Sequence, residues 1–124
     1  MSAKLAATVI GIVFVAVGLL GFVNNPVLGL FAVDTIHNLI HILSGVVLLA
    51  GAYSSLGSSM ALKIVGIVYG IVAILGFFLV NEAGMLLGIF VVNTADKWLH
   101  VGLAVVILLA AFTLPDEEAG MMRA

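Results

Sequence analysis

The sequence predicts an all-α integral membrane protein with four transmembrane helices, built from two parallel helix-hairpin repeats. Hydrophobic residues make up 65% of the 124-residue chain and charged residues 8%, with a mean hydropathy of +1.41. A soluble domain has about half and about a quarter, respectively. Four apolar segments approach the roughly 20 residues that a helix needs to cross a bilayer. The third observation is that the second half of the chain repeats motifs of the first.

The predicted spans cover residues 5–23, 36–56, 60–80 and 96–114. Each can satisfy its backbone hydrogen bonds within the helix, as hydrocarbon requires. The breaks between them contain "NNP", "SSLGSS" and "NEAG", and Pro115 ends the last span. We expect one domain with a short polar tail at 115–124. Because no A-x-A-like site follows the first span, it is predicted to be a retained membrane helix.

The repeat pairs "GIVFVAVGLLGF" at 11–22 with "GIVYGIVAILGF" at 66–77, and "LGLFAVDT" at 28–35 with "LGIFVVNT" at 87–94. Repeat one covers about 1–56 and repeat two about 60–114. Each repeat contains two spans, so both cross the membrane in the same direction, about an axis along the membrane normal. Asp34 and Asn93 are favoured N-cap residues and mark equivalent helix starts. The short apolar segments before them are expected at the outer interface.

Small residues predict where the helices pack, because they let helix backbones approach closely. The predicted packing glycines are Gly11, Gly18, Gly45, Gly66 and Gly70. Two stripes, one on the second span and one on the fourth, carry histidines, and we expect them to face each other inside the bundle. Trp98 and Tyr53 lie near span ends and are predicted interface anchors.

The few basic residues predict orientation through the positive-inside rule. With four spans, Lys4, Lys63 and Arg123 share one side and Lys97 lies on the other. We therefore expect a plasma (inner) membrane protein with both termini in the cytoplasm. The expected partners are the lipid bilayer and other membrane subunits or a second copy. A net charge of −2 gives no reason to expect nucleic acid, and the absence of cysteine excludes disulfides and thiolate ligands.

The doubled "LG-(L/I)-F-x-V" motif, followed by (D/N)-T and a histidine near a span start, resembles bacterial four-helix membrane proteins of the domain of unknown function 4383 type. The resemblance covers about residues 11–112. It implies a four-helix membrane fold and no established activity. More distantly, the layout is similar to DoxX-like membrane proteins, some of which are associated with quinone-linked redox enzymes.

All three histidines of the chain, with two aspartates nearby, fall on the predicted outer side: His37, His41, His100, Asp96 and Asp34. His37 and His41 are four residues apart and share one helix face. A divalent metal such as zinc could take these imidazoles, with His100 or Asp96 completing the ligand set. Haem b with His41 and His100 as axial ligands is a second alternative. The third is an interhelical hydrogen-bond network without any cofactor.

No Asp, Glu, Lys, Arg or His is expected at the middle of a span, which argues against an ion-coupled transporter. The sequence favours a small multi-pass membrane protein that is not an enzyme and needs no cofactor. Its expected role is an accessory or assembly subunit, or a homo-oligomeric bundle. The alternative is a metal- or haem-binding redox membrane protein that uses the histidine cluster.

Overall fold

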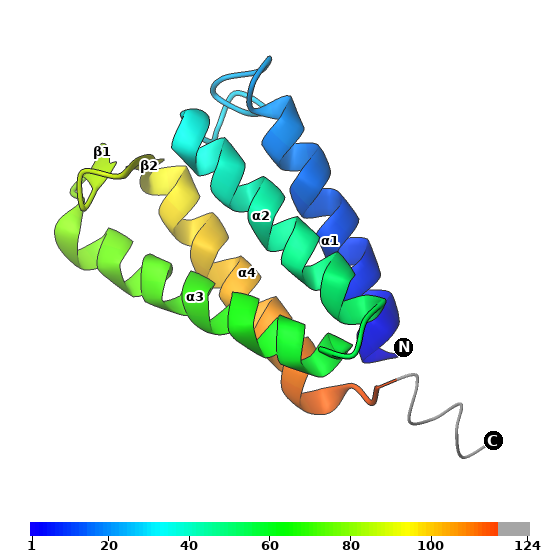
Figure 1. Cartoon of the computed structure of the whole chain (residues 1–124). Helices are drawn as coiled ribbons and strands as arrows, with labels where there is room; N and C mark the ends of the chain where they lie inside the picture. Colours follow the sequence, from blue (N-terminus) through cyan, green and yellow to red (C-terminus); the bar gives the residue numbers. More distant parts are fainter. Residues whose placement is uncertain (117–124) are drawn as a thin grey trace.

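Four long helices make up most of the computed structural model, which describes residues 1–116 (Figure 1). They are α1 (Ala3–Leu20), α2 (Thr35–Ala52), α3 (Ser58–Leu79) and α4 (Thr94–Thr113), with the short strands β1 (Ala83–Leu86) and β2 (Phe90–Asn93) before α4. All four helices are long and apolar enough to cross a membrane. The predicted four-helix membrane architecture is confirmed, with helix boundaries within four residues of those expected.

The helices form two antiparallel hairpins, α1 with α2 and α3 with α4, which lie side by side (Figure 1). Packing is extensive within each hairpin and sparser between them, where α2 meets α3. The two described chain ends meet at one end of the bundle, because the Ala3 N–H donates to the Pro115 carbonyl at 2.8 Å. We call this the inner end, and the end that carries the loops before α2 and α4 the outer end.

The outward faces of the helices are apolar. Only 33% to 39% of each span is buried inside the protein, and the remainder is largely aliphatic and aromatic. Ile12, Phe78 and Val106 are each more than half exposed. Without water in the bilayer core, such a surface is stable only against lipid or another apolar partner. Contact with the bilayer follows from this surface.

The helix starts at the outer end are capped by side chains. The Asp34 carboxylate accepts from the His37 N–H at 2.8 Å at the start of α2. Asn93 and Asp96 form a reciprocal capping box at the start of α4, with bonds of 2.9 and 3.0 Å. Each cap satisfies backbone donors that the first helical turn leaves free. The predicted caps Asp34 and Asn93 therefore occupy N-cap positions.

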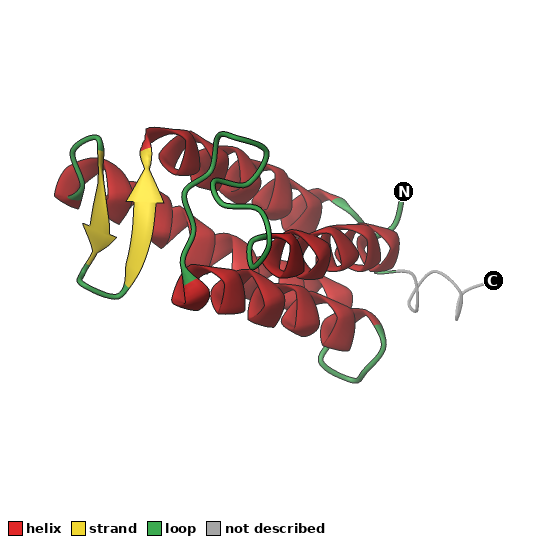
Figure 2. Cartoon of the chain, turned by 90° about the horizontal axis from the view of Figure 1, so that it is seen from above, coloured by secondary structure: helices red, strands yellow, loops and turns green. Residues whose placement is uncertain are grey.

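A two-stranded antiparallel hairpin, β1 with β2, lies at the outer end beside the start of α4 (Figure 2). The all-α prediction omitted it. Its turn contains Leu87 and Gly88 with φ of 54° and 69°, which are left-handed conformations. Leu28 and Gly29, in the equivalent motif before α2, have φ of 54° and 72°, but that segment forms only one bridge, between Val27 and Phe31. The segment before α4 is too short to span, so it pairs its backbone locally.

The glycines divide into those where helix backbones touch and those where they do not. A Cβ atom on Gly45 would lie 2.6 Å from the Gly11 carbonyl oxygen, and one on Gly18 would lie 2.8 Å from the Asn38 carbonyl oxygen. A Cβ on Gly66 would lie 2.7 Å from the Leu108 side chain. Gly70 differs, since the nearest atom would be 4.0 Å away. Gly70 is not needed for close packing, because a Cβ atom there would make only an ordinary contact with Ala104.

Candidate functional site

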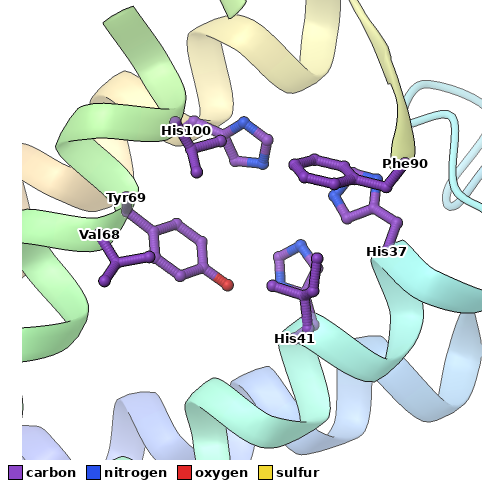
Figure 3. Close-up of a pocket in the computed structure, with 8 residues that line it drawn as sticks. His37, His41, Val68, Tyr69, Phe90 and His100 are labelled. Atoms are coloured by element: carbon purple, nitrogen blue, oxygen red, sulfur yellow. The ribbon is translucent and has the colours of Figure 1, made fainter. Parts of the chain in front are cut away.

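Three buried histidine side chains converge inside the outer half of the bundle (Figure 3). His37 and His41 come from α2 and His100 from α4, and their exposed fractions are 1%, 5% and 2%. One ring nitrogen of each lies within 4.8 Å of the corresponding nitrogens of the other two. The two histidine stripes, expected to face each other, thus meet here.

The rings contact one another closely. The centroids of His37 and His41 are 5.0 Å apart, as their spacing of one helical turn implies, and the rings are stacked. The centroid of His100 lies 5.6 Å from that of His37 and 6.3 Å from that of His41. His41 lies six residues into α2, about 9 Å from its start.

The Val91 backbone fixes the tautomer of His37. The His37 Nδ1 atom lies 2.8 Å from the Val91 carbonyl oxygen of β2. A carbonyl oxygen can only accept, so Nδ1 carries the proton and donates. In the neutral ring, Nε2 is then unprotonated and presents a lone pair. This arrangement, with one imidazole nitrogen on a backbone carbonyl and the other available, is typical of metal-bound histidines.

Three buried ring nitrogens have no hydrogen-bond partner among the described residues: His37 Nε2, His41 Nδ1 and His100 Nδ1. A buried polar atom without a partner costs about 1–3 kcal/mol. Among the described residues, no hydrogen bond joins one histidine ring to another, and the rings contact each other directly instead. A ligand that used these nitrogens would offset the cost.

The carboxylates of both aspartates accept hydrogen bonds from backbone N–H groups. Asp34 uses one oxygen on the His37 N–H and the other on the Val91 N–H at 3.1 Å. Asp96 accepts from the Asn93 N–H. The group that the described residues bring within metal-binding reach holds the three histidines and neither carboxylate. Asp96, the predicted alternative ligand, therefore lies outside this group and caps α4, while Asp34 is at its predicted position as the cap of α2.

Sequence reasoning missed Tyr69, which closes the site from α3 (Figure 3). Its ring centroid lies 5.9 Å from His41 and 5.8 Å from His100. Its hydroxyl donates to the Ser44 Oγ at 3.1 Å, and Ser44 donates to the Ile40 carbonyl at 2.7 Å. The available signal was a lone hydroxyl in the middle of an apolar span. Phe14 and Phe90, whose rings contact His41 and His37 respectively, were also missed.

A cavity of about 200 Å³ adjoins the three histidines. Its wall includes Tyr69, Val68 and Phe90 (Figure 3). The apolar side chains of Ile40 and Val72 also line it. A haem does not fit here, because a rigid macrocycle is far larger than this volume. His37 also packs against both proposed axial ligands, His41 and His100. The haem alternative is therefore set aside.

The remaining predicted residues lie at the ends of the bundle. Trp98 is 64% exposed at the outer end and packs edge-on against Phe77. Tyr53 is 66% exposed at the inner end, where the Lys4 ammonium lies 4.9 Å from its ring centroid. Lys97, expected as an outer charge, is buried, and its Nζ donates to the carbonyls of Val80 and Asn81 at the end of α3.

The fold and its buried polar cluster define a class: small multi-pass membrane proteins made of four apolar helices. Within that class, the chain belongs to the family described as Domain of unknown function (DUF4383), whose model matches residues 4–113. This confirms the family resemblance. The bacterial origin and the distant similarity to DoxX-like proteins stay predictions. No curated protein and no solved structure matches the chain.

Proposed function

We propose that this protein binds a divalent transition metal ion of the zinc class inside the membrane, through His37, His41 and His100. One observation carries the proposal: three histidine nitrogens lie within 4.8 Å of one another in a buried site. Imidazole is a favoured ligand of zinc, copper, nickel and iron. The proposed function is binding, with no reaction assigned.

The distances are close to those of a metal site. Nitrogens bound to zinc at about 2.0–2.1 Å in a tetrahedron lie about 3.3 Å apart. The widest spacing of 4.8 Å closes to this value when the rings turn inward by about 1 Å or less each. Three protein ligands also leave the fourth position free, as in sites that exchange a ligand. The adjoining cavity supplies the room for it.

The hydrogen bonding of the histidines also supports a metal site. His37 is held by the Val91 carbonyl in the tautomer that exposes Nε2. A bound ion would take up nitrogens that otherwise have no partner, which favours binding over the empty arrangement. His37 and His41 belong to the first helical hairpin and His100 to the second, so an ion here would join the two hairpins of the bundle.

We expect one zinc ion per chain in the purified protein, detected by elemental analysis after removal of any polyhistidine tag. His41→Ala and His100→Ala should each lower zinc uptake to near background. Zinc at 100 times its dissociation constant should stabilise the wild type by about 2.7 kcal/mol. Neither variant should show this increase in thermal stability.

The control for this experiment is the chelated wild type. If the histidines bind a metal, chelation should reproduce the loss of stability seen in the variants. The double variant should then be no less stable than either single variant. The hydrogen-bond network without metal predicts instead that chelators change nothing. Wild-type protein without zinc uptake, or additive losses for His41→Ala and His100→Ala, would contradict the proposal.

We propose further that both ends of the chain face the cytoplasm of the plasma membrane. The meeting of Ala3 and Pro115 supports a shared side for the two ends, and the lysine distribution gives its direction. Because the chain has no cysteine, the labelling of a single introduced cysteine shows on which side of the membrane that residue lies. Glu82→Cys should react with an impermeant maleimide from outside the cell and Ser55→Cys only after permeabilisation. The reverse pattern would contradict the orientation.

The two hairpins are also proposed to be repeats related by an axis along the membrane normal. Support comes from the matching left-handed pairs at Leu28–Gly29 and Leu87–Gly88 and from the equivalent N-caps Asp34 and Asn93. His41 and His100 occupy equivalent positions in the two motifs. His37 has Asp96 as its counterpart, so the proposed metal site uses one ligand from outside the repeat symmetry.

A further inference from the structure

The cavity beside the histidines lies between the two helical hairpins. It is lined by α2, α3, β2 and α4, and the contact between α2 and α3 is sparser than that within either hairpin. Val68 is 46% exposed, and Ile40 and Val72 are half-buried. All three line the cavity, and the exposure of Val68 places part of the cavity wall at the apolar outer surface of the bundle.

The cavity lies beside the apolar part of α3, which is long enough to cross a bilayer. Val72 lies seven residues before the end of α3, about 10 Å below the outer end. Above the site, Phe90 packs against His37, and the Val91 N–H donates to Asp34. The β1–β2 hairpin therefore lies between the histidines and the water at the outer end. A ligand has a more open path from the bilayer than from water.

The charge of a metal at this site calls for an anion, and this step rests on the function proposed above. Three neutral imidazoles leave the double charge of the ion without compensation, and uncompensated charge is costly in hydrocarbon. The nearby carboxylates of Asp34 and Asp96 accept hydrogen bonds at helix starts. An exogenous anionic oxygen at the fourth position would lower this cost.

We propose that the fourth position of the ion takes the carboxylate of a fatty-acid-like amphiphile, which enters from the bilayer between α2 and α3. The head would bind the ion as a carboxylate, after the acid has lost its proton to water at the membrane interface. The tail would lie along Ile40, Val68 and Val72, in a cavity of about 200 Å³ that has room for several methylene groups. The apolar wall selects the tail, and the ion selects the head.

The experiment uses the full chain in detergent micelles, loaded with Co²⁺, whose visible spectrum reports its ligands. Octanoic acid should change the spectrum in a saturable way, with an apparent affinity at least about tenfold tighter than that of acetate, because the tail is buried. Val72→Phe fills the cavity and should abolish the response while Co²⁺ uptake stays. Val106→Phe is the matched control, since Val106 is 57% exposed and lies outside the cavity lining.

The outcomes separate the two proposals. If Co²⁺ binds but octanoic acid leaves the spectrum unchanged, the amphiphile site is overturned and the metal site stands. If acetate acts as strongly as octanoic acid, or if Val72→Phe responds like Val106→Phe, the ligand is a small anion from water and lateral entry is overturned. If Co²⁺ does not bind to the wild type, the metal site fails and the inference fails with it.

Discussion

Gly45→Ala is expected to destabilise the bundle by about 2–3 kcal/mol, the upper part of the range for overpacking. The new Cβ would lie 2.6 Å from the Gly11 carbonyl oxygen and 2.9 Å from the Val15 backbone nitrogen. Both atoms belong to the backbone of α1, so relief requires α1 and α2 to separate along their length. Thermal unfolding in detergent, followed by circular dichroism, measures the loss.

Gly70→Ala is the matched control for that substitution. The added Cβ would meet its nearest neighbour, the Ala104 Cβ, at 4.0 Å, an ordinary contact. Alanine also has a higher helix propensity than glycine, so this variant should be as stable as the wild type or more stable. Equal losses for the two variants would show that α1 and α2 are not in backbone contact at Gly45.

Lys97→Met is expected to cost about 2 kcal/mol, the scale of hydrogen bonds made by a charged donor. The Lys97 ammonium donates to the Val80 and Asn81 carbonyls, which lie at the end of α3 where helical acceptors are left free. A cation at a helix C-terminus is also favoured by the helix dipole. Methionine keeps the apolar stem and removes the donors.

Lys63→Met provides the comparison for Lys97. Lys63 is half-buried, and its ammonium lies 5.1 Å from the Phe112 ring centroid, a contact worth about 0.5–1 kcal/mol at an exposed site. We expect a smaller loss of unfolding free energy for this variant in the same chemical denaturation assay. A loss at Lys97 no larger than that at Lys63 would mean that the two carbonyls are satisfied in another way.

The helices were predictable because their signals are local. Apolar length sets each span, and residues such as Asp34 and Asn93 mark the helix starts to within a residue or two. The shared face of His37 and His41 follows from helical spacing alone. The doubled motif then placed His100 at the depth of His41, and the structure brings it within metal-binding distance of both.

The missed features depend on atoms that residue type does not reveal. The acceptors of Lys97 and of His37 are backbone carbonyls, and any residue could supply them. Which carbonyl comes within hydrogen-bond distance of these side chains depends on how the helix ends and loops pack together. Tyr69 was missed for a related reason: its span carries no other polar residue in that region, so nothing in the sequence connected it with histidines on α2 and α4.

At the inner end of the bundle, the residues after α4 are hydrogen-bonded to the starts of two other helices. The Asp116 carboxylate accepts from the Ser59 N–H at 3.2 Å and from its hydroxyl at 3.1 Å, while the Pro115 carbonyl accepts from Ala3. Neighbouring residues thus tie the start of α3 to the start of α1.

At the outer end, the Val91 backbone is hydrogen-bonded to His37 and Asp34. The Asn93 side chain donates to the Leu30 carbonyl. The two helical hairpins are therefore joined at both ends of the bundle, which together set the distance between the histidines of α2 and the histidine of α4.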